Sequence, residues 1–127
     1  RYFSEEVRSL MATELKRIAN GCAATFGIGV DLDLRNVFSV TVNDEKAVDV
    51  VTRAAASVVG RSHVSNEREP SMGSEDFADM LAAVPGAYFL LGHRGDKPLH
   101  HPEYHFDDAL IPIGSSILAR LVENGSG

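Results

Sequence analysis

The chain has 127 residues, which is enough for one domain of ordinary size. Its hydrophobic fraction of 44% and charged fraction of 24% are typical of globular proteins and argue against disorder. The net charge is −6 and the sequence has no basic stripe, so nucleic acid and anionic membranes are poor candidates for partners. No apolar run approaches the roughly 20 residues that cross a bilayer. The single cysteine cannot form an internal disulfide and suits a reducing compartment, so we expect a cytoplasmic protein.

The first predicted helix begins after Ser4, whose hydroxyl can cap it, and two glutamates follow at its positive end. Asn20-Gly21 predicts the end of this helix. Its apolar face is formed by residues at helical spacing: Val7, Leu10, Met11, Leu15, Ile18 and Cys22. The cysteine on that face is therefore expected to be a packed thiol.

Strands are predicted in four places. From Phe26 to Leu34, apolar residues alternate with polar residues or glycine, the pattern of a half-buried strand. Residues 37–42 and a short stretch around Val64 also have extended character, and residues 87–91 form a short, continuously apolar run expected in the core. Because a one-faced strand needs sheet partners, and little precedes the first one, we expect the chain to start inside a domain.

Three more helices are predicted. The first follows the Asn43-Asp44 cap and ends at Gly60, the second is capped by Ser74, and the last starts near Asp108 with Pro112 in its first turn. Helices therefore alternate with strands along the chain, which predicts an α/β fold of the mixed α+β kind.

The segment from Leu99 to Asp108 is the most unusual part of the sequence. It contains three of the five histidines, His100, His101 and His105, together with three carboxylates. Imidazole and carboxylate are ligands that divalent metals prefer. We expect one or two metal ligands from this loop, although a polar, solvated loop explains the composition equally well. The spacing does not form a complete site, because Pro102 prevents two of the histidines from sharing a helical face.

A second candidate is the segment Ser71–Phe77. Gly73 allows close approach of a ligand to the backbone, and the start of a helix capped by Ser74 would offer free N–H groups to an anion. The segment can thus be a carboxylate-binding corner for a substrate. An ordinary helix cap followed by two acidic residues is the simpler interpretation.

Other common sites are absent from the sequence. Gly27-Ile28-Gly29 leads into a predicted strand, so it is no dinucleotide-binding fingerprint. No serine has the G-x-S-x-G surroundings of a hydrolase nucleophile. His63 and His93 border loops and are expected at the surface.

Four blocks in this order are similar to one enzyme family: residues 70–77, 84–92, 98–102 and 106–114. They resemble the C-terminal part of metal-dependent amidohydrolases of the hippurate hydrolase, N-acyl-amino-acid amidohydrolase and auxin-conjugate hydrolase type, in the aminoacylase/carboxypeptidase metallopeptidase superfamily. The resemblance implies a catalytic α/β domain with two divalent metal ions (Zn or Mn) and a smaller lid domain that makes a homodimer. The implied substrate is a small N-acyl or N-aroyl amino acid.

The resemblance also assigns parts of this chain. Residues 1–42 would be the C-terminal part of the lid and residues 43–127 the C-terminal part of the catalytic domain. His100, the first histidine of the Leu-His-x-Pro element, would be a metal ligand, and Gly73 and Ser74 would lie on the substrate side. The other ligands and the general base of such enzymes have no counterpart here, so no catalytic residue is assigned. We expect the chain to be inactive alone, with no ion necessarily bound.

Two alternatives stay open. The chain can be a non-enzymatic α+β module for ligand binding or dimerisation. It can also be a small metalloprotein with His100, His101, His105 and Asp107 around one ion.

Overall fold

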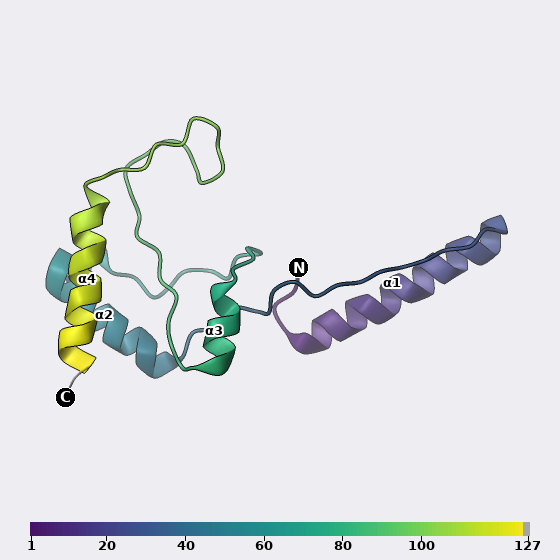
Figure 1. The fold of residues 1–127 in the computed structure, drawn as a ribbon, viewed down its shortest axis with the longest axis horizontal. Coiled ribbons are helices and arrows are strands. Elements are labelled where there is room, and N and C mark those ends of the chain that lie inside the picture. Colours follow the sequence, from purple (N-terminus) through teal and green to yellow (C-terminus); the bar gives the residue numbers. More distant parts are fainter. Residues whose placement is uncertain (126–127) are drawn as a thin grey trace. The chain divides into compact units, whose positions relative to one another are not determined.

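The computed structural model describes residues 1–125 (Figure 1). Its elements are α1 (Glu5–Phe26), α2 (Glu45–Val59), the 3-10 turn η1 (Arg61–His63), α3 (Phe77–Ala83) and α4 (Leu110–Gly125). The chain forms two compact units, the first from Arg1–Val42 with Pro70–Val84 and the second from Asn43–Glu69 with Pro85–Gly127. Within the described residues no strand forms, so the predicted mixed α+β architecture is not observed.

Helix α1 begins as predicted but ends later than predicted. The Ser4 hydroxyl accepts a hydrogen bond from the Val7 N–H, at 3.3 Å. The helix continues through Gly21 and ends at Gly27, which has a left-handed φ of 65° and donates its N–H to the Ala23 carbonyl. A glycine inside a helix costs only about 1 kcal/mol, whereas a left-handed glycine satisfies carbonyls that the last turn leaves open. The prediction that Asn20-Gly21 ends the helix was wrong for this reason.

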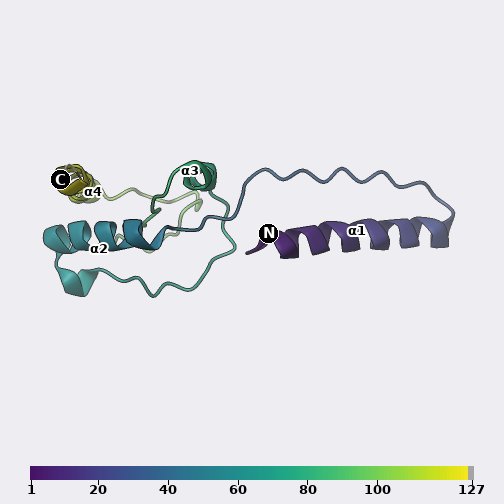
Figure 2. The same cartoon turned by 90° about the horizontal axis from the view of Figure 1, so that it is seen from below.

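The segment after α1 is extended and runs back along the helix (Figures 1 and 2). The Tyr2 hydroxyl bonds Asn36 Oδ1 at 2.5 Å, and this contact joins the two ends of the helix–segment pair. The alternating residues Ile28 and Val30 are exposed in this segment. A strand is defined by its ladder of hydrogen bonds to a neighbour, and no described residue supplies that neighbour. Alternation therefore gives an extended segment here and not a strand.

In the second unit, α2 packs against α4 (Figures 1 and 2). Asp44 caps α2 through its Oδ1, which accepts the Ala47 N–H at 2.9 Å, and Gly60 ends the helix as predicted. The side chains at the contact are buried: Ala54 is fully covered and Ile117 is 2% exposed. Small residues on α2 allow the two helices to approach closely, so one large side chain on α4 fills the interface.

The side chain of Asn43 holds residues 86–88 beside the start of α2. Its Nδ2 donates to the Tyr88 carbonyl at 2.9 Å, and its Oδ1 accepts the Tyr88 N–H at 2.8 Å. The neighbouring Asp44 N–H donates to the Gly86 carbonyl at 2.9 Å. The side-chain amide of Asn43 thus makes the two hydrogen bonds with the Tyr88 backbone that a neighbouring strand would make, but with this one residue only. The predicted strand at 87–91 is an extended segment, and Tyr88 and Leu90, expected in the core, are exposed.

The buried apolar core of the described residues is small: Ala23, Ala54, Ala55, Ala78 and Ile117. The predicted inner face of α1 is exposed at Leu10, Leu15 and Ile18, and Cys22 is an exposed thiol rather than a packed one. The apolar face that helical spacing predicts on α1 therefore lies uncovered within the described residues, and its expected burial was wrong. None of the described helices is both long and apolar enough to pass through a membrane.

Candidate functional site

The histidine-rich loop joins the extended segment before it to α4 in the second unit, and two consecutive turns shape it (Figure 1). The His101 N–H donates to the Pro98 carbonyl at 3.1 Å, and the Tyr104 N–H donates to the His101 carbonyl at 2.9 Å. The chain then enters α4 through the Asp107 Oδ1, which accepts the Ala109 N–H at 3.0 Å. The loop therefore has its own hydrogen-bonded structure, although it contains no helix or strand.

His100 occupies the third position of the first turn. Its φ is 71°, the only positive φ among the non-glycine residues that the structure describes. A positive φ at this position and a hydrogen bond from the fourth residue to the first are features of a type II turn, which usually places glycine there. The His100 side chain is exposed, and its ring makes no hydrogen bond to any described residue. Its imidazole is available to a ligand, which is what a metal-binding histidine requires.

Two other donors of the loop, His101 and Asp107, already make hydrogen bonds. His101 is half-buried, and its Nδ1 accepts the Glu103 N–H at 3.1 Å, so its neutral form carries the proton on Nε2. The Asp107 carboxylate accepts the N–H of Ala109, just before α4. Among residues 1–125, no three His, Cys, Asp or Glu side chains come close enough to hold a metal ion. The alternative of a self-contained site around His100, His101, His105 and Asp107 is therefore not what the structure forms.

This donor set fits a metal ion only in part. One accessible imidazole is a suitable single ligand, while a stable site needs about four donors. The described residues supply that single ligand and not the set.

The Gly73-Ser74 corner lies in the first unit, apart in the chain from the histidine loop. Helix α3 starts at Phe77, two residues later than a cap at Ser74 predicts, and the Asp76 side chain at its N-cap position makes no cap hydrogen bond. The Phe77 N–H instead donates to the Glu75 carboxylate at 3.4 Å. Ser74 is thus exposed but is not a helix cap, and a Cβ on Gly73 would make only an ordinary 3.6 Å contact with Ser71 Oγ. The role of the two residues in substrate binding stays a prediction.

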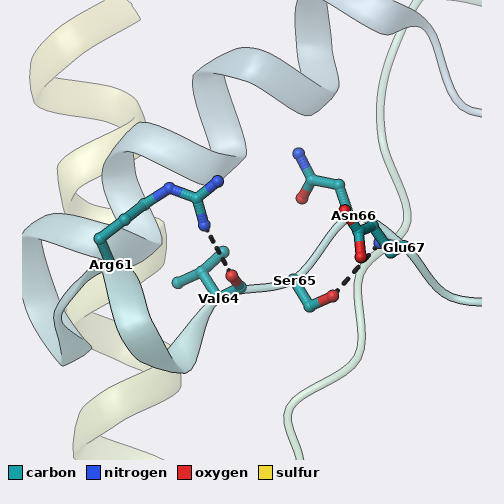
Figure 3. Close-up of a pocket in the computed structure, with 5 residues that line it drawn as sticks. All are labelled: Arg61, Val64, Ser65, Asn66 and Glu67. Carbon is teal, nitrogen blue, oxygen red and sulfur yellow. Dashed lines mark hydrogen bonds between the residues drawn. The ribbon is translucent and has the colours of Figure 1, made fainter.

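A shallow polar hollow of about 220 Å³ follows η1 (Figure 3). Its lining consists of Arg61, Val64, Ser65, Asn66 and Glu67. The Arg61 guanidinium donates to the Val64 carbonyl at 2.7 Å, and the Glu67 N–H donates to Ser65 Oγ at 3.2 Å. The lining residues thus make hydrogen bonds with one another, and the hollow follows from the fold of this loop.

Sequence reasoning missed one feature of the histidine loop. His93, expected at the surface, is half-buried and its ring meets the Tyr104 ring edge-on, with centroids 5.4 Å apart and planes at 87°. The residues between His93 and Tyr104 are glycine, proline and charged residues without a periodic pattern, so the sequence does not predict that the two rings meet. An aromatic residue at each end of a short glycine-containing loop is the signal that could have indicated it.

Comparison with known proteins assigns the family. Residues 7–124 match peptidase family M20/M25/M40. The chain is 30% identical to a hippurate hydrolase of Campylobacter jejuni over 95% of its length and 32% of that relative. It is 29% identical to thermostable carboxypeptidase 2 of Saccharolobus solfataricus, over 91% of the chain and 30% of the relative. It is also 29% identical to an N-acetylcysteine deacetylase of Bacillus subtilis, over 95% of the chain and 31% of the relative.

The chain thus spans about a third of the length of the curated relatives it matches. No solved structure gives a significant match. The family match covers almost the whole chain, including all four blocks on which the resemblance was recognised. This chain belongs to peptidase family M20/M25/M40.

Proposed function

We propose that this chain is part of a metal-dependent amidohydrolase that cleaves the amide bond of N-acyl or N-aroyl amino acids. The observation that carries the proposal is His100, an exposed imidazole without a hydrogen-bond partner on the left-handed residue of a turn. Relatives named hippurate hydrolase, N-acetylcysteine deacetylase and N-acetyldiaminopimelate deacetylase support the substrate class. Hippurate-like substrates are the specific proposal.

Two divalent ions, Zn or Mn, would supply Lewis-acid chemistry toward the scissile carbonyl and the attacking water when bound. His100 supplies one ligand, and the remaining ligands come from parts of a longer protein. His101 is oriented by the Glu103 N–H on its Nδ1, which leaves Nε2–H as a hydrogen-bond donor beside His100. The Gly73-Ser74 backbone is proposed to receive the carboxylate of the substrate.

We also propose that the rest of a longer protein completes the fold. Residues 1–42 would belong to a lid that makes a homodimer, and residues 43–127 to a mixed α/β catalytic domain. The exposed apolar residues of α1 and of the extended segment after it support this assignment, because isolated exposed faces of this size are unfavourable. The extended segments would become strands once neighbouring strands pair with them. We also propose a cytoplasmic location, because the single cysteine suits a reducing compartment.

The test compares two variants of the same loop, His100→Ala and His105→Ala. His105 is exposed and forms no hydrogen bond within the described residues, so it is a matched control. In the longer protein, His100→Ala should lower metal content and reduce hydrolysis of N-benzoylglycine and N-acetyl amino acids by more than about 100-fold, since even outer partners of a ligand cost 10- to 100-fold. His105→Ala should keep both.

The 127-residue chain alone should not hydrolyse these substrates and should bind zinc or manganese only weakly in calorimetry. Tight one-to-one binding by the chain would instead show that a complete site exists without the rest. If the longer protein with His100→Ala hydrolysed these substrates at the full rate, His100 would not be a metal ligand and the proposal would be refuted.

A further inference from the structure

The Arg1 side chain lies against the Gly73-Ser74 corner within the first unit. Its guanidinium donates a hydrogen bond to the carbonyl of Met72, the residue before Gly73. The two partners are 71 residues apart in the sequence, so the fold of this unit brings them together. A guanidinium carries five N–H donors in a planar fork, and one carbonyl leaves most of them open. Arg1 is therefore able to contact the corner and bind a second group.

No carboxylate forms an ion pair with Arg1 within residues 1–125. The other arginines of the first unit each pair with a carboxylate close by in the sequence. These pairs are Arg8 with Glu5, Arg17 with Glu14 and Arg35 with Asp33. Arg1 instead contacts a neutral carbonyl, and the residue is exposed. Among the described residues of this unit, it is thus the one arginine whose charge has no counter-charge.

The corner that Arg1 contacts is acidic. Glu75 and Asp76 follow Ser74 directly, and residues 70–84 contain no lysine or arginine. The Glu75 carboxylate accepts the Phe77 N–H at 3.4 Å, but this bond does not cancel its charge. Two adjacent negative charges disfavour an anion at the neighbouring backbone N–H groups. An anion binds here more readily when a cation from another segment offsets these charges, and Arg1 supplies that cation.

Peptide geometry decides which corner residue is able to share a ligand with Arg1. The bond between Met72 and Gly73 is trans, so the Gly73 N–H points away from the Met72 oxygen that Arg1 contacts. Ser74 follows, and neither its N–H nor its hydroxyl makes a hydrogen bond to a described residue. Ser74 therefore has donors available for a group bound by Arg1, and Gly73 contributes by carrying no side chain.

We propose that Arg1 determines specificity for substrates with a free carboxylate: its guanidinium and the donors of Ser74 together bind the carboxylate of an N-acyl amino acid. This inference rests on the proposed function, because it takes the substrate class from it. Arginine and a carboxylate form two parallel charge-assisted hydrogen bonds, which a lysine does not reproduce. The carboxylate is unchanged when the amide bond is cleaved, so the contact stabilises the ground state and the transition state alike. Its loss should raise KM and leave kcat nearly unchanged.

The test measures hydrolysis by the longer protein of two substrates that differ in one group, N-benzoylglycine and the uncharged N-benzoylglycinamide. Arg1→Ala should raise KM for N-benzoylglycine about 10- to 100-fold, the range expected when a hydrogen bond to a charged group is lost. Arg1→Lys should give an intermediate KM, because it keeps the charge but not the planar fork. Arg35→Ala is the matched control: this exposed arginine already pairs with Asp33, so KM should stay within about twofold of the unchanged protein.

The uncharged substrate separates recognition of the carboxylate from general damage to the site. With N-benzoylglycinamide, Arg1→Ala and the unchanged protein should have KM values within about twofold of each other. An equal rise in KM for both substrates would mean that the substitution disturbs the site in general, and it would overturn the proposal. An unchanged KM for N-benzoylglycine would overturn it as well.

Failure of the proposed function gives a different result, because the longer protein would then hydrolyse neither substrate. Carboxylate binding is in that case measured by NMR on the isotopically labelled 127-residue chain, acetylated at its N-terminus so that the α-amino charge does not contribute. N-benzoylglycine should shift the Arg1 Nε–H and Ser74 N–H resonances saturably and leave the Arg35 Nε–H in place, and N-benzoylglycinamide should shift none of them. No shift at Arg1, or an equal shift at Arg35, would refute the role of Arg1.

Discussion

Truncation of Ile117 to alanine tests whether α2 and α4 form the core of the second unit. Ile117 is 2% exposed and is the one large side chain buried to this degree among the described residues. The change removes three carbon atoms at about 0.8 kcal/mol each, and the cavity left behind adds to this loss. We expect a decrease of about 3 kcal/mol in the free energy of unfolding of the second unit.

The neighbouring Leu118 is the matched control. It lies on the same helix, loses as many carbon atoms on truncation and is 55% exposed. Because less than half of it is covered, Leu118→Ala should cost about 1 kcal/mol or less. Urea unfolding followed by circular dichroism at 222 nm measures both values. Equal losses for the two variants would mean that α4 does not pack on α2 through Ile117.

Three further predictions concern hydrogen bonds, backbone conformation and charge. Asn43→Ala removes both bonds to Tyr88 and should cost about 1–3 kcal/mol in urea unfolding, whereas Asn43→Asp keeps the acceptor and should cost less. Gly27→Ala places a Cβ at φ 65° and should lower the helicity of α1 and cost about 1–2 kcal/mol, while Gly29→Ala, with ordinary φ, should be nearly neutral. Hydrogen bonds from its own backbone N–H and from the N-cap serine lower the pKa of Glu6 below its ordinary value. Its contribution to α1 is therefore present above the ordinary pKa and is lost as pH falls through the lowered pKa. Circular dichroism of Glu6→Gln should lack this part of the acid transition, and an identical transition would contradict the assignment.

The helices were the most predictable part of the fold. The bounds of α2 followed from Asp44 and Gly60, because a carboxylate cap and a terminal glycine act locally and need no partner. The predicted end of α1 was wrong because either Gly21 or Gly27 could end a helix as judged from the sequence. In the structure only Gly27 adopts the left-handed φ that ends it. The start of α3 was wrong because Ser74 and Asp76 are both good caps, and neither side chain makes a cap hydrogen bond there.

Strands and burial could not be predicted in the same way, because both depend on neighbours. The alternation from Phe26 to Leu34 predicts a strand, but Phe26 is the last residue of α1, and the residues after Gly27 form an extended segment without a ladder, because a ladder requires a second strand. Cys22 follows the helical period of α1 and is nevertheless exposed, since no described element covers that face. The sequence pattern therefore describes a face that is able to pack, whether or not its partner is present.

The candidate site was predicted in part. His100 was selected from the Leu-His-x-Pro resemblance, and the structure adds its exposure and its left-handed φ. The contact between His93 and Tyr104 was missed, because a loop that folds back on itself leaves no periodic pattern. A joint role of His100, Gly73 and Ser74 in one site stays a prediction, because Gly73 and Ser74 belong to the first unit and His100 to the second.

The small core has a consequence for the surface area of the chain. The accessible area is 10119 Å². A compact protein of this mass would expose about 6,600 Å², and two separate compact halves would together expose about 8,000 Å². The excess of about 2,000 Å² is comparable to the total area that a large protein–protein interface buries. Unfolding the chain alone therefore uncovers less new apolar surface than its length suggests, so its heat-capacity increment should fall below the usual 12–15 cal/mol/K per residue.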